Sequence, residues 1–128
     1  MEAKELMIGD KVMVKVLSQI PNTYVLHTWT ANDYSRDIQV KPIPLTAEIL
    51  EKDGWERDID KEWEYNNSHI LPHYCYQWEK QNVKIEMYAG LEGFTINLII
   101  GRRFYAVHEL QHVLRLYGLD ELADNFKI

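Results

Sequence analysis

The chain has 128 residues, of which 46% are hydrophobic, so it is long enough to bury one core and short for two. We therefore expect a single domain over residues 1–128. Fourteen basic side chains stand against twenty acidic ones, and the resulting net charge of -6 argues against binding to a nucleic-acid backbone.

The compartment follows from the cysteine count and from the apolar runs. Cys75 is the one cysteine of the chain, so it has no partner for an internal disulfide. No apolar run approaches the roughly 20 residues of a membrane-spanning helix, and residues 1–5 lack the pattern of a signal peptide. These features predict a cytoplasmic protein without a membrane partner.

The first third of the chain has the pattern of three short strands. Valines alternate with other residues over 12–16, and residues 23–30 are rich in β-branched and aromatic side chains. Ile38 and Val40 indicate a third strand. Together these strands predict an N-terminal β-meander.

The middle of the chain begins with a short helix and continues with alternating strands. Thr46 is a suitable N-cap for a helix over 46–53, and Trp55 is expected to anchor its end. From Trp55 onward, apolar residues recur at every second position. This alternation predicts one antiparallel sheet with a hairpin over 55–65 and strands over 74–78, 83–87 and 94–100.

The strongest helical pattern of the chain lies at residues 105–117. At about 100° per residue its apolar side chains fall in one arc, which consists of Val107, Leu110, Val113, Leu114 and Tyr117. We expect this arc to pack on the antiparallel sheet, and His108, His112 and Arg115 to lie on the opposite, solvated side. The predicted fold is therefore α+β: an N-terminal β-meander, a short helix, an antiparallel β-sheet and a C-terminal amphipathic helix packed on the sheet.

The same helix contains the zinc-peptidase pattern His-Glu-x-x-His. His108 and His112, one turn apart, would bind Zn²⁺ while Glu109 acts as general base on the bound water. Such a site needs a third protein ligand, but Arg115 and Gly118 stand where the metzincin pattern has glycine and histidine. We therefore expect a solvated helix face with no metal, no cofactor and no catalytic residue. A zinc-dependent hydrolase is the alternative.

A second group with ligand chemistry consists of His69, His73 and Cys75. His73 and Cys75 would point the same way from a strand, which is compatible with metal binding. A half-buried cysteine beside a hairpin histidine is the more common arrangement. A nucleophilic pair of Cys75 and His73 would also need an orienting third residue, and none is identifiable.

Aromatic side chains occupy one face of the strand over 74–78. Tyr74, Tyr76 and Trp78 could stack against a planar ligand, although a strand face of this kind more often belongs to the core. A small-molecule binder is therefore a second alternative.

Three segments stand out as a set: residues 5–12 (ELMIGDKV), residues 43–55 (IPLTAEIL, then GW) and residues 107–122 (VHELQ, then YG and EL). The set resembles a group of short accessory proteins of anaerobic gut bacteria and their phages and mobile elements. In that group the helix typically reads His-Gln-Leu-Gln-Asn, which implies that Glu109 and His112 are not obligatory ligands. The resemblance implies no known activity.

These observations favour a non-enzymatic cytoplasmic accessory protein of a bacterium or phage. The lack of a complete catalytic set, the acidic surface and the resemblance support this interpretation. The expected partner is another protein or a second copy of the chain, with a small-molecule ligand as the other option.

Overall fold

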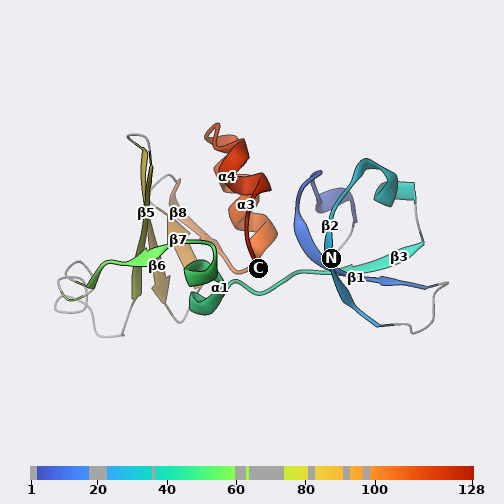
Figure 1. The fold of residues 1–128 in the computed structure, drawn as a ribbon, viewed down its shortest axis with the longest axis horizontal. Helices are drawn as coiled ribbons and strands as arrows, with labels where there is room; N and C mark the ends of the chain where they lie inside the picture. The colour runs from blue at the N-terminus through green and yellow to red at the C-terminus, as the bar shows by residue number, and fades with distance from the viewer. Residues whose placement is uncertain are drawn as a thin grey trace. The chain divides into compact units, whose positions relative to one another are not determined.

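The structure is a computed structural model that describes residues 3–17, 23–35, 37–59, 63, 74–80, 83–90, 93–96 and 99–128. Antiparallel strands combined with helices, one of them near the C-terminal end, confirm the predicted α+β class (Figure 1). The chain divides into two compact units, Met1–Pro44 with Ala106–Phe126 and Leu45–Tyr105 with Lys127–Ile128. That the chain is a single domain stays a prediction, because compactness alone does not decide whether a unit folds independently.

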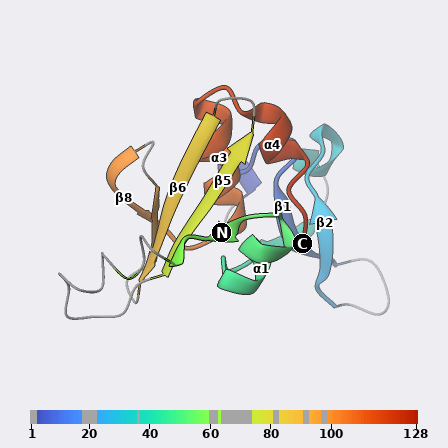
Figure 2. The same cartoon turned by 60° about the vertical axis from the view of Figure 1, so that its left-hand side comes forward.

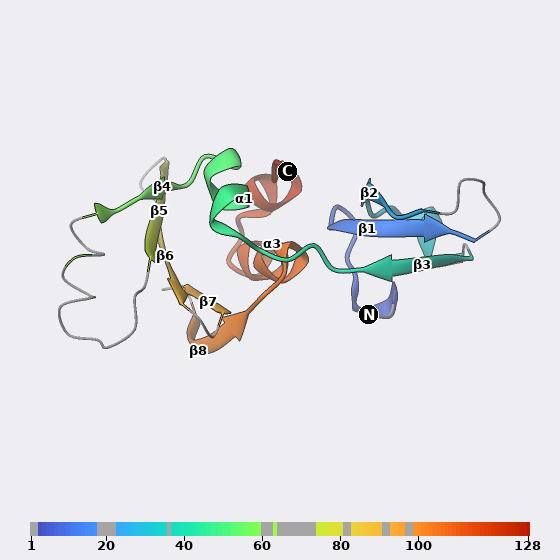
Figure 3. The ribbon, with the colours of Figure 1, turned by 90° about the horizontal axis from the view of Figure 1, so that it is seen from below.

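The first unit contains a three-stranded antiparallel sheet. The 3-10 helix η1 (Ala3–Glu5) leads into β1 (Lys11–Val16), which is followed by β2 (Val25–Thr28), the 3-10 helix η2 (Ala31–Ser35) and β3 (Ile38–Lys41). The three predicted strands are confirmed. The strand order is β2-β1-β3 (Figure 3). In a meander β3 would pair with β2, but here it pairs with β1. The valine-rich strand thereby takes the central position.

The core of this unit lies on one face of the sheet. It consists of Leu6, Val12, Val14 and Trp29, with Ile38 and Val40 packed against them. Because side chains alternate along a strand, Lys11, Met13 and Lys15 point to the opposite face. The sheet therefore has one apolar face and one face with basic side chains.

The second unit begins with the short helix α1 (Ala47–Lys52), as predicted. Its N-cap is Thr46, whose hydroxyl oxygen accepts the Ile49 N–H at 3.2 Å. Gly54 adopts a φ of +96° after the helix, and the Trp55 N–H then donates to the Leu50 carbonyl at 3.0 Å. Trp55 is buried, which confirms its predicted role as an anchor.

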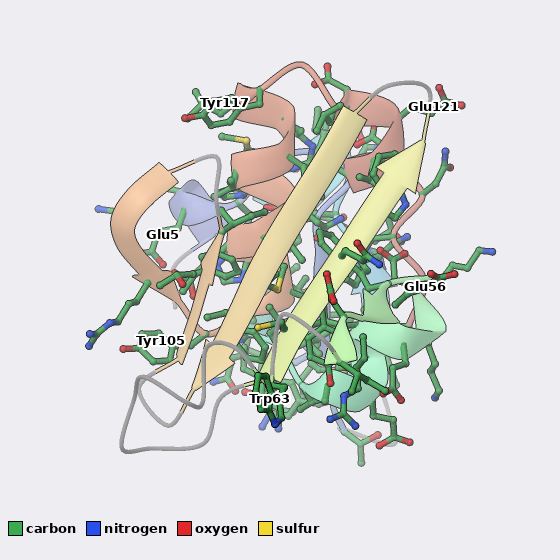
Figure 4. The ribbon with its side chains drawn as sticks, turned by 90° about the vertical axis from the view of Figure 1, so that its left-hand side faces the viewer. Glu5, Glu56, Trp63, Tyr105, Tyr117 and Glu121 are labelled. Atoms are coloured by element: carbon green, nitrogen blue, oxygen red, sulfur yellow. The ribbon has the colours of Figure 1, made fainter. Side chains whose placement is uncertain are left out.

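The five-stranded sheet of this unit consists of β4 (Glu56–Arg57), β5 (Tyr74–Lys80), β6 (Val83–Gly90), β7 (Gly93–Ile96) and β8 (Ile99–Phe104). The strands follow one another in this order and all pair antiparallel. Figures 2 and 4 show β5 and β6, its two longest strands, side by side. The predicted antiparallel sheet is therefore confirmed for the described residues between Glu56 and Phe104.

One detail of this sheet differs from the prediction. The predicted strand over 94–100 is divided into β7 and β8, and Ile96 pairs with Ile99 of the next strand. The alternation of apolar residues runs on through both strands, so the sequence pattern does not mark the division. β4 pairs with β5. The return strand of the predicted hairpin over 55–65 falls almost entirely outside the described residues, so the hairpin stays a prediction.

Two helices complete the first unit. They are α3 (Val107–Leu116) and α4 (Asp120–Asp124), and α3 contacts both α4 and β1. Gly118, at a φ of +77°, separates them and provides the predicted end of α3. Among the described residues, no helix has the length and apolar character needed to cross a membrane.

The apolar arc of α3 is confirmed except at its last position. Val107, Leu110, Val113 and Leu114 are buried, whereas Tyr117 is 47% exposed. Tyr117 is the residue that caps the helix, so it projects beyond the last turn (Figure 4). The packing of this arc on the five-stranded sheet stays a prediction.

Candidate functional site

One carboxylate of the first unit is completely buried. Asp10 lies in the turn before β1, where Gly9 adopts a φ of +94° and donates its N–H to the Trp29 carbonyl at 2.8 Å. The Met7 N–H donates to Asp10 Oδ2 at 2.8 Å. The turn thus holds a negative charge in the interior, where it needs strong partners.

Helix α3 supplies these partners. Nε2 of His112 lies 2.5 Å from Asp10 Oδ2, and the Arg115 guanidinium donates to Asp10 Oδ1 at 2.5 Å. The two helical residues are three positions apart and therefore share one side of α3. Arg115 also contacts Oδ1 of Asp124 in α4 at 3.2 Å. Both oxygens of the buried carboxylate are therefore hydrogen-bonded, which the burial of an ion pair requires.

Gln111 ties the same side of α3 to backbone groups of two other segments. Its side chain is fully buried, and its Oε1 accepts the Lys11 N–H at 2.8 Å. Its Nε2 donates to the carbonyls of Gly9 and Ala123 at 3.0 and 2.9 Å. One amide therefore satisfies backbone groups of β1, of the turn before it and of α4.

The hydrogen bonds decide the charge of Asp10. Burial by itself would raise the pKa of this carboxyl, but hydrogen bonds from His112, Arg115 and the Met7 N–H outweigh burial and hold the pKa below its ordinary value. Asp10 is therefore ionised at neutral pH.

His108 shows the opposite effect of burial on a base. Burial lowers the pKa of its imidazole, and the nearby His112 lowers it further, against a smaller effect of the surrounding carboxylates. Its Nδ1 is buried and has no hydrogen-bond partner among the described residues, and its ring meets that of His112 edge-on at a centroid distance of 5.5 Å. His108 is therefore a neutral, packed side chain.

The prediction that the polar side of α3 is solvated was wrong. His108 is 8% exposed and Gln111 is not exposed at all, while the side chains of His112 and Arg115 are only 24% and 14% exposed. The physical reason is the buried carboxylate of Asp10, because His112 and Arg115 on this side of the helix bind it. The polar side of α3 is therefore covered within the first unit.

The three residues of the zinc-peptidase pattern do not converge on one point. Glu109 turns back to its own helix start, where its Oε1 accepts the Ala106 N–H at 3.1 Å. Nε2 of His112 binds Asp10, and the ring of His108 contacts that of His112 edge-on. Among the described residues, no group of three or more histidine, cysteine, aspartate or glutamate side chains is arranged to hold a metal ion.

The other candidate groups lie partly outside the described residues. Residues 69 and 73, the histidines of the second cluster, are not among the described residues, and the Cys75 side chain is buried. Tyr76 is 2% exposed and Trp78 is half-buried, which places Tyr76 in the core and leaves it no free ring face for a ligand. The aromatic strand thus offers little accessible surface at its centre.

A second buried carboxylate lies beside β2 in the same unit. Asp33 Oδ2 accepts from His27 Nε2 at 2.7 Å and from the N–H and hydroxyl of Thr30, both at 2.8 Å. Burial would raise the pKa of Asp33, but these hydrogen bonds lower it to about 2. This group fixes η2 against β2.

Sequence reasoning missed Asp10, Gln111 and Asp33. The partners of Asp10 lie more than a hundred positions further along the chain, so no local pattern marks it.

Comparison with protein-family models, curated proteins and solved structures finds no match. The resemblance to accessory proteins of gut bacteria and phages therefore stays a prediction.

Proposed function

We propose that the chain is a non-enzymatic, cytoplasmic accessory protein that acts by binding another protein or a second copy of itself. One observation carries the proposal: the residues with catalytic chemistry on α3 are used to hold its own fold. Nε2 of His112 binds Asp10 and Oε1 of Glu109 accepts the Ala106 N–H, so both side chains take part in interactions that hold the helix in its place.

The resemblance to accessory proteins of bacteria and phages supports the same proposal, although it implies no particular partner. A binding protein needs only a stable scaffold and an accessible surface. The described residues provide both, because several large apolar side chains are well exposed: Ile8, Val25, Leu26, Trp63, Tyr105 and Leu116.

The decisive experiment combines capture with a test of catalysis. The tagged chain is used as bait in an extract of its native host, and its own association is measured by sedimentation equilibrium. We expect either one reproducibly enriched protein or a defined oligomer.

A monomer that enriches no protein would contradict the proposal. So would hydrolysis of a peptide or ester that is lost in Glu109→Gln. This variant is a fair control because a glutamine oxygen can still accept the Ala106 N–H, so loss of hydrolysis would not reflect loss of the helix start.

A further inference from the structure

One face of the N-terminal sheet carries three lysines without an acidic partner. Lys11 and Lys15 of β1 share this face with Lys41 of β3, because Lys41 pairs with Met13. The Lys11 ammonium donates to the Thr28 hydroxyl at 2.6 Å. Within the described residues, none of the three forms an ion pair with a carboxylate. We call the surface formed by Lys11, Lys15 and Lys41 the lysine face.

Tyr24 holds two of these charges together. Nζ of Lys41 lies 4.3 Å and Nζ of Lys15 lies 5.1 Å from the centre of its ring. The Tyr24 hydroxyl donates to Gln39 Oε1 at 3.4 Å. Because two ammonium groups already contact the ring, it is poorly placed to stack on a nucleobase. In a chain with a net charge of -6, this concentration of positive charge is complementary to an acidic protein.

The neighbouring strand β2 is an edge of the described sheet, because the strand order is β2-β1-β3. Val25 and Leu26 of β2 are 54% and 51% exposed. Natural edge strands are commonly protected by lysine or proline. The other edge, β3, ends with Lys41 and is followed by Pro42, but β2 contains neither residue. Within the described residues, β2 therefore presents an edge that contains no lysine or proline and has two exposed apolar side chains.

We propose that β2 binds an extended, acidic segment of a partner protein, which adds to the sheet as a fourth strand and directs alternate carboxylates to the lysine face. This inference rests on the proposed function and names the chemistry of its partner. An added strand lies about 4.8 Å from its neighbour. The Lys11 ammonium, already at Thr28 of β2, is within reach of such a strand.

A second copy of the chain fits this edge less well. Pairing of β2 with β2 would join two sheets that both carry a lysine face, and like charges brought together across an interface oppose association. The acidic segment meets the same backbone edge and neutralises the lysines.

The test is fluorescence anisotropy with a labelled peptide of about ten residues in which valine and glutamate alternate. Its controls are the peptide with lysine in place of glutamate, the glutamate peptide with alternate amides N-methylated, and a single-stranded oligonucleotide of equal charge. We expect the glutamate peptide to bind at least about tenfold tighter than each control, and its affinity to fall with added salt.

Two charge reversals locate the site. Lys11→Glu combined with Lys41→Glu should weaken binding of the glutamate peptide at least about tenfold. Lys52→Glu, on an exposed position of α1, is the matched control and should leave binding unchanged. Thermal unfolding of the double variant is measured beside binding, so that a loss of fold is recognised.

Three results would overturn the inference. They are equal binding of the glutamate and lysine peptides, full binding by a folded Lys11→Glu/Lys41→Glu variant, and tighter binding of the oligonucleotide through the same lysines. If the double variant still captures the same host protein as the wild type, the inference fails while the proposed function stands. If no host protein and no oligomer is found, the proposed function itself fails.

Discussion

At the scale of single residues, Gln111 is expected to contribute strongly to the stability of the buried network. Gln111→Ala leaves the Lys11 N–H and the carbonyls of Gly9 and Ala123 without partners in the interior. We expect the free energy of unfolding to fall by about 3 kcal/mol, since each unsatisfied buried group costs about 1–3 kcal/mol and water can replace part of the loss. Urea titration followed by circular dichroism measures it.

Gln39→Ala is the matched control, because Gln39 is exposed on β3. Its effect should stay within about 0.5 kcal/mol. Equal midpoints for the two variants would show that the Gln111 hydrogen bonds do not stabilise the unit.

Asp33 should make the free energy of unfolding depend on pH under acidic conditions. Its pKa of about 2 in the folded chain lies below the ordinary 3.8, so its contribution is present above about pH 4 and is lost as the pH falls through 2. The difference corresponds to about 2 kcal/mol. Asp33→Asn should remove this part of the pH dependence, whereas Asp37→Asn, at an exposed position, should not. Urea titrations between about pH 5 and pH 2 decide between these outcomes.

His108 should also make the free energy of unfolding depend on pH, but in a higher pH range, because it is a base and not an acid. Because burial lowers its pKa below 6.5, the folded chain binds this proton less readily than the unfolded chain does. Stability should therefore be full above about pH 6.5 and decrease as the pH falls below it.

His108→Phe replaces an imidazole whose Nδ1 has no partner among the described residues by an apolar ring of similar shape. The variant should be at least as stable as the wild type at pH 7 and should lose less stability at pH 5.5. Melting temperatures at both pH values test this, and a wild type that becomes more stable on acidification would refute it.

At the scale of elements, the turn before β1 and the turn after α3 both need glycine, but for different reasons. A Cβ at Gly9 would lie 2.7 Å from Asp124 Oδ1 and 2.9 Å from the Arg115 guanidinium, whereas a Cβ at Gly118 meets nothing within 4 Å. Gly118→Ala should therefore cost only the backbone strain of a positive φ, about 1 kcal/mol.

Gly9→Ala carries the same strain and must also displace the contact between Arg115 and Asp124. We expect it to cost clearly more, about 2–3 kcal/mol. Chemical denaturation of the two variants gives the comparison. Equal losses would mean that the Arg115 side chain moves aside freely.

Most elements were predictable because their patterns are local. The valines of β1, the Thr46 cap and the apolar arc of α3 each lie within one short segment, and each was placed correctly apart from Tyr117 at the end of the arc. The division of β7 from β8 was not predictable, because Ile96 and Ile99 fit a single alternating strand as well as two strands joined by a tight turn. The pairing of β4 with β5 spans undescribed residues and has no local signal.

At the scale of the whole molecule, the candidate site was harder to predict than the fold. The zinc-peptidase pattern drew attention to His108, Glu109 and His112, but which atoms face them depends on a turn at the other end of the sequence. Helical periodicity distinguishes apolar from polar sides, and it does not distinguish a polar side in water from one packed on a buried carboxylate. In α3 the polar side is packed on the carboxylate of Asp10.

The same arrangement leads to a prediction about metal content. We expect purified protein to contain no stoichiometric zinc, because Asp10 occupies Nε2 of His112 and no third ligand stands beside the two histidines among the described residues. Elemental analysis after dialysis against a mild chelator measures it. About one zinc per chain, lost in His108→Ala, would reverse this expectation and support the hydrolase alternative.

The hydrogen bonds between Asp10 and α3 also set an order of events during synthesis. They join residues 102 and 105 positions apart. At about 5–20 residues per second, a ribosome makes the helix roughly 5–20 s after the turn. Throughout that interval the carboxylate lacks its imidazole and guanidinium partners, and the nascent sheet cannot bury it cheaply. The N-terminal strands are therefore expected to mature only once α3 has left the ribosome, so an interrupted product that ends before Val107 should remain open to the proteases that clear incomplete chains.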